Sequence, residues 1–492
     1  MASLNEIRQA RLEKIEILKS KGWDPYPSQV PRTLSLDHTS SRFEELVDAD
    51  QEQSLTGRVM AIRGQGAIQF VVLKEGKDEF QAVFKKDELS EADFELFQQT
   101  VDIGDFISVT GKLFKTQRGQ ESLLAKTWLM ASKSLRPLPE KWHGLADQDT
   151  KYRQRYLDII SDPTVFERFV NRSKVVRAIR NYMEDMGFLE IETPILQNQA
   201  GGAMAEVFNT HHNALDQDMV MRISLELEHK IVMAAGYEKV FEIGKIFRNE
   251  GMDPTHLQEF TMMEWYAAWA TLEDNMRWTE DMIKNIAHSV IGKDEYIVWD
   301  KEGKEHAINL SKEYQRVYFN DLIKENANLD VNTAYMEEIK NKAGEYGMDQ
   351  EEIEKTGKAN LLDFIYKKSS RLNIIQPTFV MGYPSDLKPL AKPNEDGTAQ
   401  VAQLVIAGAE ITNQYGELID PLEQRRLLED QAAAKEAGDK EAMDIDERFL
   451  TAMEHGMPPM TGFGMGIDRL VAILTEQNNL RDVVFFPNLK EK

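Results

Sequence analysis

The sequence has no cysteine among its 492 residues. This absence excludes disulfide bonds, thiolate metal ligands and cysteine nucleophiles. Long hydrophobic runs are also missing, because apolar stretches such as residues 401–409 are far shorter than the roughly 20 residues that a membrane-spanning helix needs. The N-terminal residues carry acidic side chains and lack an apolar core followed by a cleavage site, which argues against a targeting peptide. We therefore expect a cytoplasmic protein without a membrane segment.

The sequence has fewer basic residues than acidic ones. The chain has 59 Lys and Arg against 83 Asp and Glu, which gives a net charge of −24. This balance argues against a general attraction to nucleic acid. However, salt screens charges beyond about 8 Å, so a local basic face can still bind an anion. Residues 111–141 form such a segment, with seven Lys or Arg and two Glu.

The hydrophobic pattern of the first third predicts a helical extension followed by a small barrel. Spacings of three and four between Leu4, Ile7, Ile15 and Leu18, with the aliphatic stem of Arg11 between them, predict an amphipathic helix within an extension of residues 1–50. Five short strands follow, with a helix at residues 90–99 after the third. The expected strands are residues 55–62, 68–73, 79–84, 106–113 and 122–130. This order favours an OB-fold β-barrel over residues 51–135, with another small β-barrel as the alternative.

A proline-containing linker, residues 136–160, separates the expected barrel from a second domain at residues 161–492. There, long helices at 163–186 and 272–291 occur with strands at 219–223, 240–247, 260–269 and 401–413. Regular strand–helix–strand alternation is missing, so a mainly antiparallel sheet is expected and the fold class is α+β. A charged helical insertion is expected at about residues 310–375, with a solvated surface helix at 337–358 as its simplest explanation.

Three segments of the second domain stand out together. They are G-F-L-E-I-E-T-P-I-L at residues 187–196, F-R-N-E-G at 247–251 followed by E-F-T-M-M-E-W-Y at 259–266, and T-G-F-G-M-G-I-D-R-L at 461–470. Each is weak alone, but in this order they resemble the three signature motifs of the class II aminoacyl-tRNA synthetases. Further stretches, including T-H-H-N-A-L-D at residues 210–216 and R-P-L-P-E-K-W-H-G-L at 136–145, resemble the bacterial-type lysyl-tRNA synthetases over essentially the whole length.

That resemblance implies an OB-fold anticodon-binding barrel and a class II catalytic domain with a mainly antiparallel six-stranded sheet flanked by helices. It implies a homodimer with the first motif at its interface. The implied reaction is activation of L-lysine by ATP to lysyl-adenylate and pyrophosphate, then transfer of the lysyl group to the 3′-hydroxyl of the terminal adenosine of tRNA(Lys). The implied cofactor is Mg²⁺, with up to three ions in the family.

The lysine-binding residues follow from the resemblance, residue by residue. Lysine has one carboxylate and two ammonium groups, so its pocket needs one cation and several acids. Arg248 is expected to hold the carboxylate and the α-phosphate of ATP, Glu226 the α-ammonium, and Glu264 with Glu417 the ε-ammonium. The other expected lysine-binding residues are Gly202, Tyr266, Asn413 and Tyr415. A surface salt bridge is the alternative for each acid, but Glu264 lies in an apolar run where an unpaired carboxylate would be costly.

The same resemblance supplies the ATP contacts. Glu250 is expected to read the adenine edge, Phe260 to stack on its ring, and His256 to reach the triphosphate. Arg469 is expected to hold the γ-phosphate at the start of a helix, whose dipole also favours an anion. Arg248 and Glu410 complete the expected ATP site. Because the lysine carboxylate is already ionised, no general base is needed, and Arg248 and Arg469 are the expected catalytic residues.

The sequence departs from the family at its metal site. Glu410 is an expected Mg²⁺ ligand, but Gln403 stands where a second glutamate is expected. An amide oxygen can coordinate a metal, yet it carries one negative charge fewer, so weaker Mg²⁺ binding and a higher Mg²⁺ requirement are expected. The alternative is that Glu395 or Asp396 replaces it. The loop T-H-L-Q-E-F at residues 255–260 also lacks an arginine that relatives have in R-H-N-P-E-F.

The expected anticodon contacts lie on the barrel. Phe70 is expected to stack on a base, with Gln81 and Arg63 beside it, although Phe70 in the barrel core is the alternative. R-G-Q-E-S at residues 118–122 replaces the usual G-E-L-S, so Gln120 or Glu121 is a further candidate.

Three other functions stay open. A lysine ligase acting on a protein would lack the barrel that residues 1–135 supply. An aspartyl- or asparaginyl-tRNA synthetase would need a cation where this chain has Glu264 and Glu417. A catalytically inactive nucleic-acid-binding homologue would not need Arg248, Glu250, Glu410 and Arg469.

Overall fold

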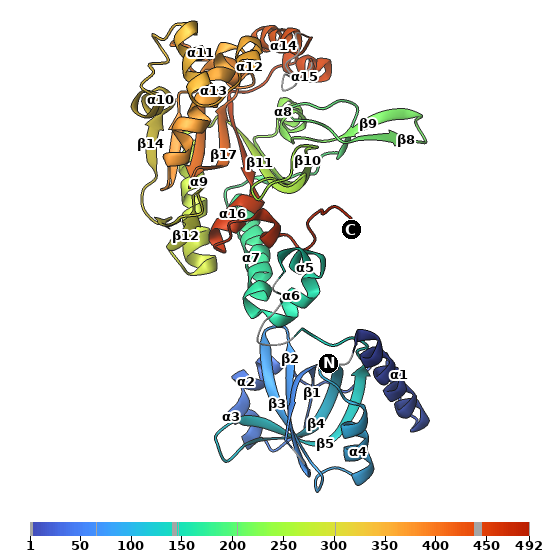
Figure 1. Ribbon diagram of the computed structural model, residues 1–492. Helices are drawn as coiled ribbons and strands as arrows, with labels where there is room; N and C mark the ends of the chain where they lie inside the picture. Colours follow the sequence, from blue (N-terminus) through green and yellow to red (C-terminus); the bar gives the residue numbers. More distant parts are fainter. Residues whose placement is uncertain are drawn as a thin grey trace. The chain divides into compact units, whose positions relative to one another are not determined.

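The computed structural model in Figure 1 describes residues 3–64, 66–139, 145, 147–203, 205–300, 302–436 and 445–491. The chain divides into two compact units, Met1–Glu167 and Arg168–Lys492. Within the described ranges, no helix combines the length and the hydropathy that crossing a lipid bilayer requires.

The first unit contains a closed five-stranded barrel with the strand order β1-β2-β3-β5-β4. Its strands are β1 Gln53–Arg63, β2 Ile68–Glu75, β3 Asp78–Lys85, β4 Phe106–Lys115 and β5 Glu121–Ser132. Helix α4, Glu91–Thr100, follows β3. Strands β3 and β5 pair in parallel, and the other neighbours pair antiparallel. The predicted strand number, the helix after the third strand and the OB topology are therefore confirmed.

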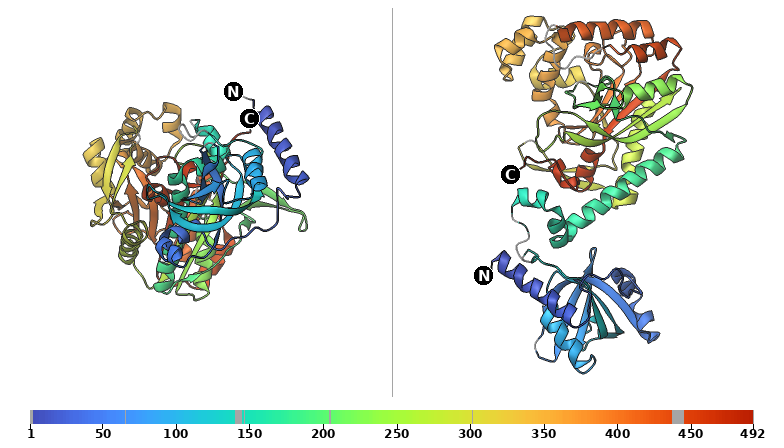
Figure 2. Two further views of the ribbon diagram at one scale, coloured as in Figure 1. Left: turned by 90° about the horizontal axis from the view of Figure 1, so that it is seen from below. Right: turned by 90° about the vertical axis from the view of Figure 1, so that its right-hand side faces the viewer.

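Three N-terminal helices pack on this barrel and share its core. They are α1 Leu4–Ser20, α2 Leu36–Ser41 and α3 Phe43–Asp48. Leu18, Leu36 and Phe43 are buried in the same cluster as Val71 and Phe84 of the barrel. Figure 2 shows α1 beside the barrel strands. The extension is thus a structural part of the barrel unit.

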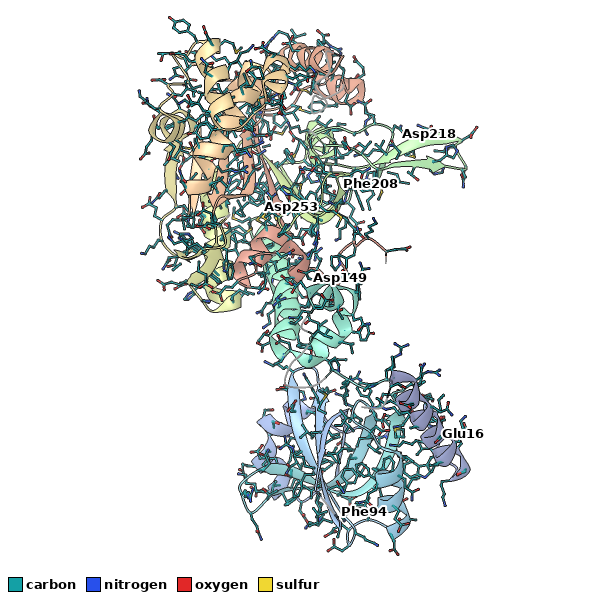
Figure 3. All side chains as sticks on the ribbon, viewed as in Figure 1. Glu16, Phe94, Asp149, Phe208, Asp218 and Asp253 are labelled. Atoms are coloured by element: carbon teal, nitrogen blue, oxygen red, sulfur yellow. The ribbon has the colours of Figure 1, made fainter. Side chains whose placement is uncertain are left out.

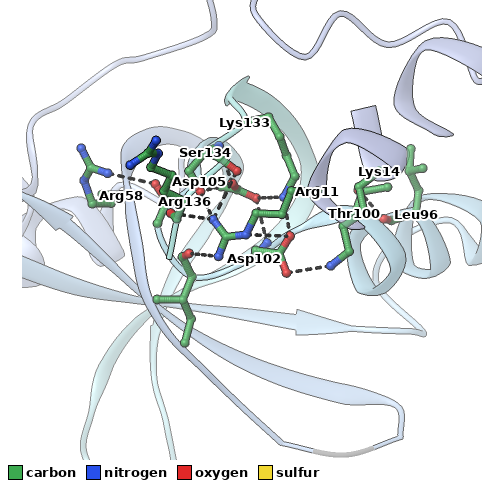
Figure 4. A network of polar contacts seen from close by, with 12 residues as sticks. Arg11, Lys14, Arg58, Leu96, Thr100, Asp102, Asp105, Lys133, Ser134 and Arg136 are labelled. Carbon is green, nitrogen blue, oxygen red and sulfur yellow. Dashed lines mark hydrogen bonds and ion pairs between the residues drawn. The ribbon is translucent and has the colours of Figure 1, made fainter. Parts of the chain in front are cut away.

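The side chain of Arg11 fixes α1 through a polar network (Figure 4). Its guanidinium donates hydrogen bonds to the carbonyl oxygens of Arg136 and Ile103, both at 3.0 Å. Asp102 lies beside it and accepts from Lys14 at 2.7 Å and from Lys133 at 2.6 Å. The sequence predicted packing of the Arg11 stem, whereas the structure buries the charged group as well.

The second unit is built on an eight-stranded sheet with the order β14-β15-β16-β17-β18-β11-β10-β6. The six central strands are antiparallel neighbours, as predicted, and one short strand pairs in parallel at each edge. The strands are β6 Leu189–Glu190, β10 Lys239–Phe247, β11 Glu259–Ala268, β14 Gln315–Tyr318, β15 Thr378–Met381, β16 Val401–Ile406, β17 Ala409–Gly416 and β18 Met460–Gly466.

One predicted strand is wrong, because residues 401–413 form a hairpin. Ala407 and Gly408 connect β16 to β17 with φ values of 50° and 74°. Two consecutive left-handed residues make the tight turn of a two-residue hairpin, which a continuous apolar run conceals. As a result, Gln403 on β16 lies opposite Asn413 on β17.

Helices cover one face of this sheet and form the largest core. They are α7 Pro163–Asp185, α9 Leu272–Asn285, which continues as a π-helical turn Ile286–Ile291, and α16 Ile467–Leu474. Trp265 of β11 and Phe463 of β18 stack in this core with ring centroids 3.4 Å apart. The opposite face remains available for a site.

Four helices lie between β14 and β15. They are α10 Phe319–Ala327, α11 Met336–Glu345, α12 Gln350–Lys355 and α13 Lys358–Ser369. Ile339, Ile353 and Leu361 are buried in a core of their own. The charged segment at 337–358 is therefore more than a solvated helix, because its few apolar residues build a packed subdomain.

Two further helices of the first unit are α5 Gln148–Arg153 and α6 Arg155–Ser161. The second unit also contains β7 Leu196–Gln197, β8 Asn209–His212 and β9 Gln217–Met221, α8 Glu226–Ala234, β12 Glu295–Trp299 and β13 Glu305–Asn309, α14 Pro421–Glu436 and α15 Glu447–Glu454.

Candidate active site

The second and third sequence motifs meet on neighbouring strands of the sheet. Strand β18 pairs with β11 on one side and with β17 on the other. Residues directly opposite each other in antiparallel strands point to the same face. Register places Glu264, Gly464 and Asn413 in one row, and Tyr266, Gly462 and Tyr415 in the next. Four of the eight predicted lysine-binding residues, Glu264, Tyr266, Asn413 and Tyr415, therefore share one face of the sheet, on β11 and β17 with the glycines of β18 between them.

Glu264 is buried at the centre of this face, with 4% of its surface exposed. One carboxylate oxygen accepts hydrogen bonds from Ser224 Oγ and Leu225 N, both at 3.1 Å, and the other accepts from the Tyr266 hydroxyl at 3.1 Å. Burial raises the pKa of Glu264, and the charge of Glu226 raises it further. No basic side chain of the described residues pairs with this carboxylate within 4.0 Å.

Glu226 and Glu417 complete the acidic cluster and share a buried cation. Lys230 Nζ lies 2.7 Å from Glu226 Oε1 and 2.5 Å from Glu417 Oε2. The other oxygen of Glu417 has no hydrogen-bond partner in the described part of the chain. Burial raises the pKa of Glu417, against the charge of Lys230. Sequence reasoning missed Lys230, although its position four residues after Glu226 on α8 was a usable signal.

Glycine at 462 is required by the approach of these side chains. A Cβ at this position would overlap Glu417 Oε1 and would lie 2.5 Å from Cε1 of Tyr266. The neighbours of this glycine are therefore residues of the predicted lysine pocket. Gly202 adopts a φ of 77°, and a Cβ there would lie 3.0 Å from Cβ of Glu226.

Arg248 follows β10 and faces the same cluster. Its guanidinium donates from Nε and Nη2 to the Ile223 carbonyl at 3.3 Å and lies 5.3 Å from the ring centroid of Phe260. Burial lowers the pKa of Arg248, while the charges of Glu250, Glu264 and Glu410 raise it. The fold therefore gathers the predicted carboxylate-binding cation with acids from three different segments.

Arg469, in the first turn of α16, lies beside the loop after β10. Its Nη1 donates to the Glu410 carbonyl at 2.7 Å, and its Nη2 lies 3.5 Å from His256 Nε2. The other ring nitrogen of His256 contacts Asp253 at 2.8 Å, and Asp253 is labelled in Figure 3. His256 and Arg469 therefore lie side by side, as expected of two residues predicted to bind the same triphosphate.

The loop between β10 and β11 has its own internal contacts. Gln258 Nε2 donates to the carbonyl oxygens of Glu250 and Gly251 at 3.2 and 3.0 Å. Glu250 itself is exposed, and Phe260 is half-buried. Gln258, which stands where relatives have proline, therefore holds this loop closed through its side-chain amide.

Gln403 is committed to a hydrogen-bond chain. Its Oε1 accepts from the Tyr383 hydroxyl at 2.6 Å, and its Nε2 donates to Asn413 Oδ1 at 3.2 Å. Asn413 in turn donates to the Tyr415 hydroxyl at 2.7 Å. The side chain is 5% exposed. Gln403 therefore acts as a link in a neutral network, and it does not fit the role of a charged metal ligand.

The other candidate metal ligands differ from each other. No donor among the described residues contacts the Glu410 carboxylate, so it is free to bind a cation. Asp396 caps a turn by accepting from Thr398 N at 3.0 Å and Thr398 Oγ1 at 2.6 Å, and Glu395 is exposed. Within the described ranges, no group of three or more His, Asp or Glu could hold a metal. These side chains fit a metal ion that is bound by the Glu410 carboxylate together with oxygen atoms of a ligand.

The predicted anticodon residues share the outer face of the barrel. Arg63 lies opposite Phe70, and Gln81 lies opposite Val72, two residues further along β2. Phe70 is 36% exposed while Val71 is fully buried, so Phe70 is not a core residue. Gln81 Nε2 donates to Ser122 Oγ at 2.7 Å.

Two families match this chain. Residues 147–490 match the family described as tRNA synthetases class II (D, K and N), and residues 53–130 match the OB-fold nucleic acid binding domain. A lysine–tRNA ligase of Lactococcus lactis subsp. cremoris (strain MG1363) is 43% identical over 501 residues, covering 99% of each chain. Another, from Enterococcus faecalis (strain ATCC 700802 / V583), is 40% identical and covers 100% of this chain and 98% of the relative. A third, from Nostoc punctiforme (strain ATCC 29133 / PCC 73102), is 42% identical and covers 99% and 88%. The chain therefore belongs to the class II tRNA synthetases of the D, K and N group and carries their OB-fold domain.

Proposed function

We propose that this enzyme is a lysine–tRNA ligase. The observation that carries the proposal is the buried cluster of Glu226, Glu264 and Glu417 beside Arg248. With Lys230, these side chains hold three negative and two positive charges when all are ionised, a net charge of −1. Lysine, with two ammonium groups and one carboxylate, carries +1 and would neutralise the site. An aspartate or asparagine side chain would leave buried carboxylates without a partner, which is strongly unfavourable.

The first step needs positioning and charge neutralisation. A lysine carboxylate oxygen attacks the α-phosphorus of ATP, the bond from that phosphorus to the bridging oxygen breaks, and pyrophosphate leaves. Arg248 contacts both reacting groups, and Arg469 with His256 holds the outer phosphates. Fixed cations of this kind stabilise the charge that develops in the transition state. Glu250 and Phe260 are assigned to the adenine ring.

The second step transfers the lysyl group to tRNA. The 3′-hydroxyl of the terminal adenosine attacks the carbonyl carbon of the adenylate, an ester bond forms, a proton is released and AMP leaves. We assign recognition of the anticodon to Arg63, Phe70 and Gln81 on residues 51–135, and the chemistry to residues 161–492. Stacking on an exposed aromatic ring contributes about 1–3 kcal/mol per base.

Cofactor, assembly and location complete the proposal. Mg²⁺ would be held by Glu410 with the phosphates of ATP, and it supplies positive charge to the triphosphate. We further propose a homodimer that uses residues 187–196 at its interface. We expect it to act in the cytoplasm, where tRNA is used.

Lysine-dependent exchange of pyrophosphate into ATP tests the amino-acid assignment. Each of the 20 amino acids is supplied in turn to the full-length protein, together with norleucine, which lacks the ε-amine. We expect exchange with lysine and at least about 10⁴-fold less with norleucine, because a site built to bind a polar group rejects an analogue without it. Exchange with aspartate or asparagine, or equal exchange with norleucine, would overturn the proposal.

A protein-modifying lysine ligase is the second candidate, since it would share the same first step. The barrel favours tRNA, because its match is to a nucleic-acid-binding family. Charging of a tRNA(Lys) transcript, and loss of charging when its anticodon is changed, separates the two functions.

A further inference from the structure

Lys388 is a cation of the site that no assigned role uses. It follows the short helical turn Ser385–Leu387, and hydrogen bonds hold the two residues that come after it. Gln424 Nε2 donates to the Pro389 carbonyl at 3.0 Å, and Leu418 N donates to the Leu390 carbonyl at 3.1 Å. The loop that carries Lys388 is therefore anchored against the end of β17.

The ammonium group lies next to the network of Gln403. Lys388 Nζ is 5.2 Å from the ring centroid of Tyr383, and the hydroxyl of that tyrosine is bonded to Gln403. The side chain is partly buried, yet no carboxylate of the described ranges lies within 4.0 Å of Nζ. Burial lowers the pKa of Lys388, while the charges of Glu410, Asp363 and Glu226 raise it and that of Lys367 lowers it. A half-buried cation without a direct partner is costly unless an anionic ligand pairs with it.

The surroundings of Glu410 are unusually cationic. The negative charge of the Glu410 carboxylate raises the pKa values of Arg248, Arg469 and Lys388. The positive charge of Arg371 lowers the pKa of Arg469. Nε of Arg371 is buried without an acceptor among the described residues. Three positive side chains thus lie within the influence of one carboxylate, with Arg371 acting on one of the three. This arrangement is suited to a ligand with several negative charges, such as a triphosphate.

Charge arithmetic connects Lys388 to position 403. Glutamine in place of glutamate removes one negative charge from the expected metal site, and the ammonium of Lys388 adds one positive charge beside it. Compared with a site that has a glutamate at position 403 and no ammonium beside it, the local charge is more positive by two units. This difference equals the charge of one divalent cation. We propose that the ammonium of Lys388 binds the triphosphate of ATP and takes over the work of one Mg²⁺ ion. This proposal rests on the proposed ATP site, and it reverses the higher Mg²⁺ requirement expected from Gln403 alone.

Equilibrium binding of ATP to the full-length protein, measured by calorimetry in EDTA and in 10 mM MgCl₂, tests the proposal. Lys388→Met keeps most of the side-chain volume and removes the charge. In EDTA we expect it to weaken ATP binding about tenfold to hundredfold, the range of a charged hydrogen bond. In MgCl₂ the loss should be less than about threefold, because the ion restores the missing charge. Lys392→Met is the matched control, since Lys392 is exposed on the same loop.

Three results would overturn the proposal. They are equal affinities of Lys388→Met and the unaltered protein for ATP in EDTA, an equal loss with and without Mg²⁺, and weaker binding of L-lysine in place of ATP. The last result would assign Lys388 to the amino-acid carboxylate. These measurements need no turnover, so they are separable from the lysine-dependent exchange that tests the function itself.

The double variant Lys388→Met/Gln403→Glu provides a constructive check. It rebuilds a pair of carboxylates and removes the competing cation. We expect its ATP affinity to be lowest in EDTA and to rise steeply with Mg²⁺, more than tenfold across the titration. A Mg²⁺ response that superimposes on that of the unaltered protein would show that neither position acts on the triphosphate.

Discussion

Two buried glutamates that face each other across β10 and β11 should respond in opposite ways to the same substitution. Glu242 and Glu264 are directly paired and have exposures of 3% and 4%. Glu242 accepts from Arg222 at 2.7 Å and from the Thr193 hydroxyl at 2.7 Å. Burial raises the pKa of Glu242, but hydrogen bonds from His229 and Thr193, with the charge of Arg222, outweigh burial and lower it overall. The pKa of Glu264 is raised instead.

These shifts set the sign of each effect on stability. A carboxyl with a lowered pKa in the folded state stabilises the fold above its unfolded pKa, and this contribution is lost as the pH falls through the folded value. A carboxyl with a raised pKa opposes folding once the pH exceeds its unfolded value. At pH 8, Glu242→Gln should therefore lower the free energy of unfolding by about 3–5 kcal/mol, because Arg222 loses its counter-charge. Glu264→Gln should leave the melting temperature unchanged or raise it.

The effect on lysine activation runs the other way. Removing the charge partner of a buried ammonium costs about 3–5 kcal/mol, so Glu264→Gln should reduce kcat/KM for lysine about 150- to 4,000-fold. Pyrophosphate exchange at pH 8, with ATP binding as a control, measures the loss, and thermal unfolding measures stability. A lower melting temperature for Glu264→Gln together with an unchanged KM for lysine would refute the assignment and make Glu264 a structural residue.

Further substitutions probe other parts of the molecule. Phe70→Ala should raise KM for tRNA about 5- to 150-fold and leave pyrophosphate exchange unchanged; a parallel fall in exchange would make Phe70 a folding residue. Gly462→Ala should raise KM for lysine about 5- to 150-fold by overpacking the pocket, whereas Gly464→Ala, whose Cβ would lie 3.8 Å from its nearest neighbour, should change it little. Equal KM values for these two variants would contradict the packing argument. Arg11→Met should release α1, seen as faster amide hydrogen exchange over residues 4–20, while unchanged protection there would show that apolar packing alone holds the helix. Because the pKa values of Glu264 and Glu417 are raised, lysine binding should weaken as the pH falls, beginning well above the usual carboxyl range; an affinity constant down to pH 5 would contradict this.

Sequence patterns predicted the strands of the barrel because their apolar residues fall in short runs and the turns between them carry glycine or charged residues. The gathering of Glu264, Asn413 and Tyr415 came only from the family resemblance, since strand order is set by contacts between distant segments. The hairpin at Ala407–Gly408 was missed because alanine gives no turn signal, and it adopts a left-handed φ here. Lys230 and Lys388 were missed because a lysine in the sequence reads as a solvated side chain until its burial is known.

The ammonium of Lys230 has a consequence for the speed of binding. Three carboxylates in an empty pocket would repel one another and move apart, but this internal cation holds Glu226 and Glu417 in place before substrate arrives. A pocket already in its binding geometry needs no rearrangement after the encounter. Lysine association should therefore follow a single exponential whose rate rises linearly with lysine concentration and reaches no plateau. Lys230 thus keeps Glu226 and Glu417 in the positions that bind the substrate L-lysine.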